Sequence, residues 1–158
     1  MKILVTNHHL ERFGGSELHT FDVCLALKKM GHEVLAVTFL YGYPMRKLFE
    51  REGLRVLNFL EEQCVETYFD LIIAHHFPVL VDVLLEKAVG CKKLILHSMS
   101  SFLHLEEFII FNEDYCLYTT NSEENRQKKL KTGIQDITVF SNSVPDIFLA
   151  YFRQEKKA

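Results

Sequence analysis

Short apolar runs alternate with helical patterns along this chain, and the alternation constrains the fold more than any other feature of the sequence. The run Leu71-Ile72-Ile73-Ala74 is the plainest example. A strand that is apolar on both faces is typical of a parallel sheet covered by helices on each side. On this pattern, strands are predicted at residues 2–6, 33–38, 55–58, 70–75, 93–97, 115–119 and 137–140.

Helices are predicted between these strands. Their expected ranges are residues 16–30, 44–52, 78–88, 102–111 and 122–131. Ser16 and Ser122 are predicted N-caps, and Gly31 is a predicted C-terminal stop. Strands that alternate with helices imply right-handed crossovers. The expected fold is therefore α/β, a doubly wound, mainly parallel, Rossmann-like sheet of about seven strands with helices on both faces, in one domain spanning residues 1–158.

Charge and cysteine content exclude several classes of protein. The net charge of −3 argues against a nucleic-acid partner. Lys128, Lys129 and Lys131 are predicted to be the solvated face of a helix. The cysteines contain no CxxC pair, so we expect reduced thiols rather than a zinc or redox motif at Cys24, Cys64, Cys91 and Cys116.

The expected location is cytoplasmic. Residues 3–5 are too short an apolar run for a signal peptide, and no run in the sequence reaches the ~18 residues that cross a bilayer. Two aromatic-rich stretches, residues 41–49 and 102–111, leave peripheral contact with a membrane surface or an acceptor groove open. Burial in the core is the favoured interpretation for Phe102, Leu105, Phe108 and Ile109.

Polar residues follow three of the predicted strands. Ligands of an open parallel sheet bind beyond the carboxyl ends of the strands, where the strand order reverses. If the order is 3-2-1-4-5, the first, fourth and fifth strands are neighbours. Five of the eight histidines then gather around one crevice. The residues in question are His8 and His9, His75 and His76, and His97 with Ser98.

The loop at residues 7–15 is longer than the 2–6 residues common before a helix. It ends in Gly14 and Gly15, followed by Ser16. Glycines let backbone approach a ligand, and the free N–H groups of the next helix suit an anion such as a diphosphate. A tight turn without ligand is an equal alternative, because the GxGxxG fingerprint is absent.

The histidines have three interpretations. They can polarise or deprotonate a hydroxyl, since imidazole titrates near neutrality. Three imidazoles with a water molecule can form a hydrolytic zinc site, although no HxH or HExxH spacing is present. They can also be hydrogen-bonding residues without chemistry. The clustering favours a role in chemistry for His75 and His97.

Taken together, these features resemble the N-terminal domain of GT-B glycosyltransferases of family 4. The resemblance covers about residues 1–148. The stretches that carry it are the opening strand 1–5, Gly14-Gly15-Ser16-Glu17, Gly31-His32-Glu33-Val34, the strand 70–75 with its terminal histidine, and Leu96-His97-Ser98.

The resemblance implies a set of residue roles. The glycine loop of such domains touches the donor diphosphate, which assigns donor phosphate binding to Gly14, Gly15 and Ser16. It assigns the catalytic position, near the transferred sugar, to His75. The implied acceptor-binding residues are His8, His9, His76, His97 and Ser98. No metal and no cofactor are expected, and a nucleotide-sugar is the co-substrate.

The expected function follows from this resemblance. The chain would be the acceptor-side domain of a glycosyltransferase that moves a sugar from a nucleotide-sugar to a saccharide or lipid-linked acceptor. The family's C-terminal donor-binding domain is absent from these 158 residues. A separate donor-domain subunit is one way to supply it, and the isolated chain should be close to inactive. The alternatives are a non-catalytic saccharide-binding or docking subunit, and a small metal-dependent hydrolase that uses the histidine cluster.

Overall fold

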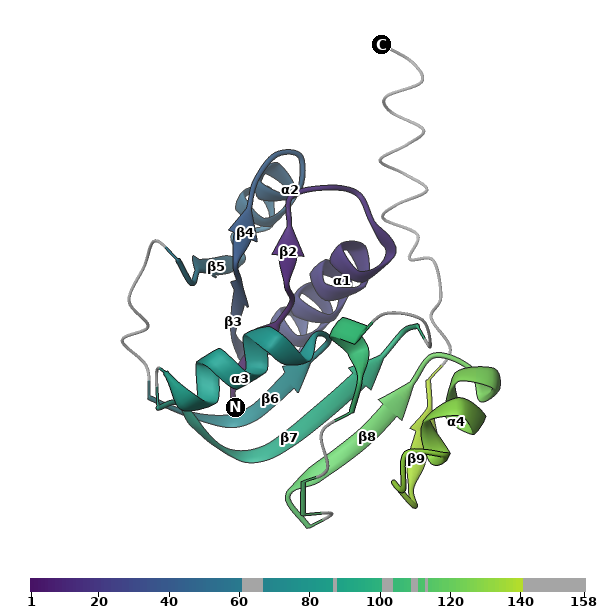
Figure 1. Ribbon diagram of the computed structural model, residues 1–158. Coiled ribbons are helices and arrows are strands. Elements are labelled where there is room, and N and C mark those ends of the chain that lie inside the picture. Colours follow the sequence, from purple (N-terminus) through teal and green to yellow (C-terminus); the bar gives the residue numbers. More distant parts are fainter. Residues whose placement is uncertain (61–66, 87, 101–103, 109–110, 113, 141–158) are drawn as a thin grey trace.

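Seven strands form one parallel sheet in the computed structural model, which describes residues 1–60, 67–86, 88–100, 104–108, 111–112 and 114–140 (Figure 1). The strand order is β5-β3-β1-β6-β7-β8-β9, and each neighbouring pair is parallel. The predicted fold class and the predicted adjacency of the first, fourth and fifth strands are confirmed. The strands are β1 (Lys2–Thr6), β3 (Glu33–Thr38), β5 (Arg55–Asn58), β6 (Tyr68–Ala74), β7 (Gly90–Ser98), β8 (Cys116–Thr120) and β9 (Ile137–Val139).

Helices cover both faces of the sheet. On one face α1 (Gly15–Lys29) and α2 (Met45–Arg51) pack over β1, β3 and β5. On the other face lie α3 (Phe77–Leu85), α4 (Glu123–Leu130) and the 3-10 helix η1 (His104–Glu106). Alternate residues of β1 enter the two hydrophobic clusters: Leu4 belongs to the α3 side, and its neighbours in β1 belong to the α1 side. The two-sided burial expected of a parallel sheet is therefore present.

The helix ends agree with the sequence at two of three positions. Gly31 follows α1 with φ of 83°, a conformation that favours glycine. The Ser122 hydroxyl accepts a hydrogen bond of 3.2 Å from the N–H of Asn125 and caps α4. The prediction that Ser16 caps α1 is wrong. Gly14 takes the extended N-cap conformation, so that Ser16 lies in the first turn and donates to the Glu17 carboxylate at 2.7 Å.

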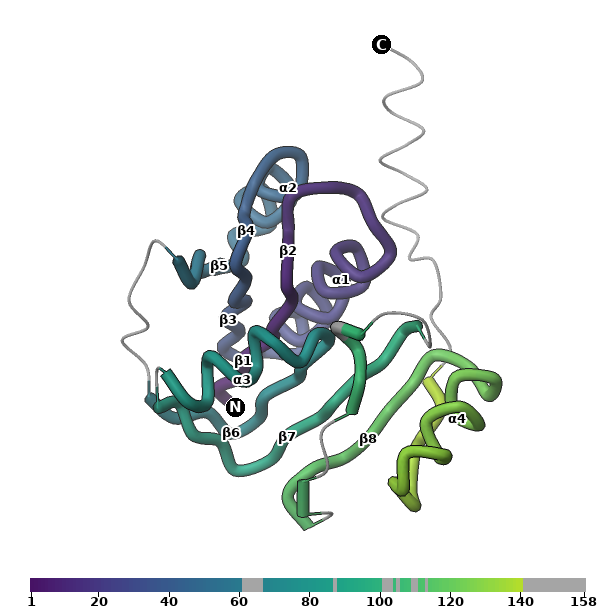
Figure 2. Tube along the Cα trace, in the orientation of Figure 1, coloured from purple at the N-terminus to yellow at the C-terminus, as the bar shows by residue number. Residues whose placement is uncertain are grey.

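Two short strands were not predicted. β2 (His9–Leu10) and β4 (Leu40–Tyr41) pair in parallel as a second, two-stranded sheet. They continue the chain beyond the carboxyl ends of β1 and β3 (Figure 2). Two residues are too few to show a strand period in sequence. Leu10 is fully buried and anchors this ribbon to the α1 side of the core.

The predicted helix at residues 102–111 is wrong where the structure describes it. Only η1 is helical, and Glu107 and Phe108 follow it in irregular backbone. The Glu106 carboxylate turns back to the N–H groups of Met99 and Ser100, at 2.5 and 2.6 Å, which replaces a continuing helix by a closed loop. Phe108 packs against the core as predicted, whereas Phe102, Ile109 and the Leu105 side chain lie outside the described residues.

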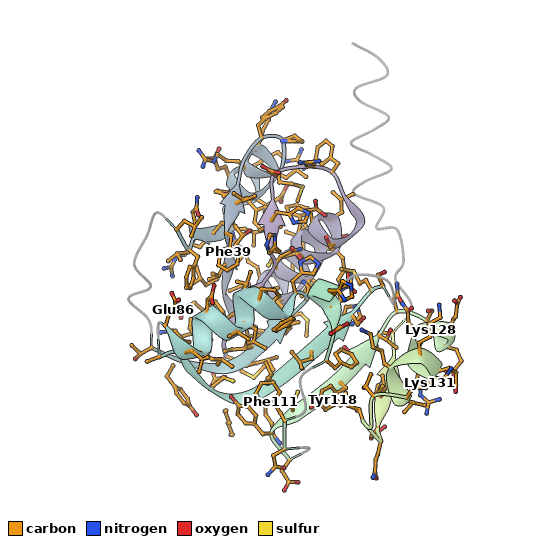
Figure 3. The ribbon with its side chains drawn as sticks, viewed as in Figure 1. Phe39, Glu86, Phe111, Tyr118, Lys128 and Lys131 are labelled. Carbon is orange, nitrogen blue, oxygen red and sulfur yellow. The ribbon has the colours of Figure 1, made fainter. Side chains whose placement is uncertain are left out.

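The prediction of reduced thiols is confirmed for the described cysteines, and the prediction of a solvated lysine cluster is wrong for Lys129. Cys24, Cys91 and Cys116 are buried free thiols, as predicted, and Cys64 lies outside the described residues. Lys128 and Lys131 lie on the outer side of α4 (Figure 3). Lys129 is buried instead, and its ammonium group donates to the carbonyl oxygen of Glu106 at 2.6 Å.

No helix in the described part of the chain is long and apolar enough to cross a membrane.

A groove of about 370 Å³ lies on the sheet itself. It crosses the middle of β6 and β7 and the beginning of β8. Leu117 in the groove is 43% exposed. The lining residues are Leu71, Lys93, Leu94, Ile95, Tyr115, Cys116 and Leu117.

The stability of the sheet should depend strongly on Ile72 and little on Leu117. Ile72 is fully buried in β6, so Ile72→Ala leaves a cavity and should lower the free energy of unfolding by about 2–5 kcal/mol. Leu117→Ala, in the partly exposed neighbour two strands away, should cost about 1 kcal/mol or less. Urea denaturation followed by circular dichroism measures both, and equal losses would contradict the described arrangement of the two faces.

Candidate functional site

Six of the eight histidines meet beyond the carboxyl ends of β1, β6 and β7. β6 lies between β1 and β7 in the sheet, so the chain segments that leave these three strands are neighbours. The five histidines predicted from the sequence are all present. His19, from the second turn of α1, joins them and was missed.

The histidines form two groups. The inner histidines are His19, His75 and His97. The rings of His75 and His97 are 5.7 Å apart, and His19 packs against both, at 5.1 and 4.9 Å between ring centroids. The outer histidines are His8, His9 and His76, whose ring centroids lie 5.5 to 6.3 Å apart.

A buried threonine fixes the orientation of His75. The Thr20 hydroxyl donates to the carbonyl oxygen of Ser16 at 2.8 Å and accepts from the Asn7 amide at 2.7 Å. Its remaining contact is with Nδ1 of His75 at 2.8 Å. Because the hydroxyl proton is already used, Nδ1 of His75 donates to Thr20 and its Nε2 carries a lone pair. That Nε2 is buried and has no hydrogen-bond partner among the described residues.

His97 is held in the same way. Its Nδ1 lies 2.8 Å from the Thr119 hydroxyl, which donates to the carbonyl oxygen of Leu96 at 3.4 Å. Nδ1 is therefore the donor, and Nε2 of His97 is a second buried nitrogen with no partner in the described part of the chain. Two inner histidines thus present hydrogen-bond acceptors that the described residues leave unused, which is costly without a ligand or water.

Burial keeps the inner histidines neutral. Burial, followed by the neighbouring His19, His97 and His76, lowers the pKa of His75 well below its ordinary value. Burial and His19 lower the pKa of His97 to about 4, against an opposing effect of Glu106. Burial also lowers the pKa of His19. At neutral pH these rings are uncharged acceptors rather than cations.

Two buried carboxylates flank the outer histidines. Oε1 of Glu17 lies 3.1 Å from Nε2 of His9, and Oε1 of Glu106 lies 3.7 Å from Nε2 of His76. His76 also accepts the backbone N–H of His8 at Nδ1, at 3.1 Å. His76 therefore carries its proton on Nε2, directed at Glu106.

Glu106 holds the loop after β7 in place. Its Oε2 accepts from the N–H groups of Met99 and Ser100, and from the Ser98 hydroxyl at 3.2 Å. Burial opposes ionisation of Glu106, but hydrogen bonds from His76 and from these backbone groups outweigh it and lower the pKa of the carboxyl group. The Ser98 hydroxyl, predicted to bind an acceptor, is buried and donates within this loop instead.

The two glycines at the start of α1 have different surroundings. A Cβ atom on Gly14 would overlap the Glu17 carboxylate, whereas one on Gly15 would meet nothing within 4 Å. The cap residue Gly14 offers no side-chain hydrogen bond to the first turn. The space beside the Cα of Gly15 is therefore open, whereas a carboxylate lies against Gly14 at the end of α1 where negative charge is favoured.

No group of three histidine, cysteine, aspartate or glutamate side chains within the described residues is arranged to hold a metal ion. A cavity of about 10 Å³ does lie between His75, His97 and Glu106, which is room for about one water molecule.

Sequence reasoning missed His19, Glu17 and Glu106 as site residues. His19 follows Ser16 by one helical turn, so the start of a helix at the crevice could have indicated it. Glu17 and Glu106 became relevant only through tertiary contacts.

Comparisons of the chain with protein-family models, curated proteins and solved structures found no match.

The inner histidines should make stability fall in mild acid. Below about pH 6.5, His75 and His97 bind protons in the unfolded chain but stay unprotonated in the folded one. The free energy of unfolding therefore decreases as pH falls from about 6.5 toward 4. Each such histidine contributes a slope of at most about 1.4 kcal/mol per pH unit. Urea denaturation at several pH values measures it.

A pair of variants isolates this effect. Asn in place of His97 keeps an amide N–H where Nδ1 donates to Thr119, so His97→Asn should flatten the pH dependence between 6.5 and 4. His104→Asn is the control, because the His104 side chain is 96% exposed. Equal slopes in the wild type, His97→Asn and His104→Asn would contradict the assignment.

Proposed function

We propose that this chain is the acceptor-side domain of a glycosyltransferase that moves a sugar from a nucleotide-sugar to a saccharide or lipid-linked acceptor, together with a donor-binding domain. The observation that carries the proposal is the pair of unused Nε2 acceptors on His75 and His97, near the uncapped start of α1. The two Nε2 acceptors suit a hydroxyl-rich ligand, and the start of α1 suits an anion.

The acceptor pair selects for ligands that donate hydrogen bonds. Neutral imidazoles with Nδ1 tied to threonine can only accept at Nε2, and a sugar hydroxyl is such a donor. His19 is the partly exposed member of the group and packs against both rings, so the proposal places the ligand beside His19. In this proposal His75 acts nearest the transferred sugar, and His97 helps to bind the acceptor.

The start of α1 suits the diphosphate of the donor. Backbone N–H groups and the helix dipole favour negative charge there. The Glu17 carboxylate lies on the Gly14 side, so the proposal places the phosphates at Gly15 and the Ser16 N–H, with Gly14 as their support.

The structure gives less support to the two alternatives, a saccharide-docking subunit and a metal-dependent hydrolase. The apolar groove lined by Leu71, Ile95 and Leu117 lies across the middle of the sheet and not at the histidines, so it adds nothing to a saccharide-docking role at the crevice. The metal-dependent hydrolase needs three convergent ligands, and the described residues offer no such set.

Substitution of Gly15 tests the diphosphate site. Gly15→Asp places a negative charge at the first residue of α1, where a side chain meets open space and an acid stabilises the helix by about 0.3–1 kcal/mol. The same charge repels a diphosphate. We expect UDP and UDP-glucose, titrated to millimolar concentration and followed by NMR, to bind the wild type and to bind Gly15→Asp about tenfold more weakly or worse, a change of about 1.4 kcal/mol.

Ser122→Asp is the matched control, because it adds the same charge at the N-cap of α4 and retains a capping oxygen. It should bind as the wild type does. A wild-type chain that binds neither nucleotide-sugars nor simple saccharides such as glucose and maltose would overturn the proposed function.

A further inference from the structure

We propose that Glu17, His9 and His8 form a hydrogen-bonded relay that makes Nε2 of His8 the proton acceptor of the crevice. The proposal rests on the proposed function only for the identity of the ligand, a hydroxyl of the sugar acceptor. The relay itself follows from three side chains on two segments of the chain, the residues directly after β1 and the first turn of α1.

The buried end of the relay fixes the first tautomer. The Glu17 side chain is 4% exposed, and its Oε2 already accepts from the Ser16 hydroxyl. Its Oε1, 3.1 Å from Nε2 of His9, can only accept. Nε2 of His9 therefore carries a proton, and in the neutral ring its Nδ1 carries a lone pair.

The second tautomer follows from the first. Nδ1 of His9 lies 3.3 Å from Nδ1 of His8. Because the His9 nitrogen is the acceptor, Nδ1 of His8 must donate, or two lone pairs would face each other. Nε2 of His8 is then unprotonated, and no hydrogen bond to it is found among the described residues. The partly exposed end of the relay thus presents a basic nitrogen.

The groups around His8 keep Nε2 of His8 unprotonated at neutral pH. The His8 ring is faced by His9 from β2 and by His76 at the N-cap of α3. Behind these two rings lie the carboxylates of Glu17 in α1 and Glu106 in η1. The ring centroids of Phe39 and His8 are 5.4 Å apart. Burial, followed by His9 and His76, lowers the pKa of His8.

The proton step is balanced within the relay. The O–H bond of the ligand hydroxyl breaks, its proton moves to Nε2 of His8, and the electron pair remains on the hydroxyl oxygen. His8 becomes an imidazolium that still donates from Nδ1 to His9. The negative charge of Glu17 stabilises it through His9, as a carboxylate orients and supports a catalytic imidazole elsewhere. Glu17 and His9 are positioning residues, and His8 is the group that contacts the ligand.

Nitrogen-15 NMR of the histidine rings tests the relay on the chain alone. At pH 8 we expect the proton of His9 on Nε2 and the proton of His8 on Nδ1 in a long-range ¹H–¹⁵N correlation spectrum. As pH falls, the second proton of His8 should appear on Nε2. A wild-type His8 with its proton on Nε2 would overturn the proposal without any variant.

Glu17→Gln tests whether the negative charge of Glu17 raises the pKa of His8. The amide oxygen can still accept from His9, so both tautomers should persist, while loss of the negative charge should lower the pKa of His8 further. Glu107→Gln is the matched control, since Glu107 pairs with the exposed His104 at the same 3.1 Å. The proposal fails if Glu17→Gln moves the titration of His8 no more than Glu107→Gln does. If the relay is confirmed but UDP-glucose and maltose do not bind, the proposed function fails and the relay stands.

Discussion

The parallel pairing of β1 with β6 is the contact on which the site depends. β3 lies on one side of β1 and β6 on the other, so the chain order reverses between β1 and β6. Connections that leave these strands therefore diverge to opposite faces of the sheet, and they open a space that α1 and α3 border from different sides. The N–H of His75 donates to the carbonyl oxygen of Thr6 at 3.2 Å, which extends the β1–β6 ladder by one residue and places His75 beside Asn7.

Much of this arrangement could be predicted because it depends on local pattern. The bounds of β1, β3 and β5 agree with residues 2–6, 33–38 and 55–58, since each is a short apolar run between turn residues. The strand order 3-2-1-4-5 was assumed from the fold class, and the structure has it. The five histidines of the crevice were then predictable from their positions after strands, with no knowledge of their contacts.

The rest depends on tertiary contacts that leave no pattern in the sequence. Glu106 ends the expected helix at residues 102–111 because three donors of the preceding loop compete for its carboxylate. Lys129 is buried because the carbonyl oxygen of that same residue and the Phe108 ring lie against α4. Ser16 is not the cap because Gly14 holds the N-cap position and α1 begins at Gly15. At Glu106 and Lys129, tertiary contacts outweigh a favourable local propensity.

The inner histidines contact threonine hydroxyls, and the outer histidines are linked to carboxylates. This difference suits the inner group to ligand binding and the outer group to proton transfer. His75 and His97 contact neutral threonine hydroxyls, which fix a tautomer but bring no negative charge to the ring. His8 and His76 are linked to Glu17 and Glu106, through His9 in one case and directly in the other, so a proton gained there meets a negative charge. An imidazolium is therefore more favourable at the outer group than at the inner one. In the proposed function, hydroxyl binding at the inner histidines and proton uptake at His8 occur in one crevice, because His8 is linked to the Glu17 carboxylate through His9 while the inner rings remain neutral acceptors.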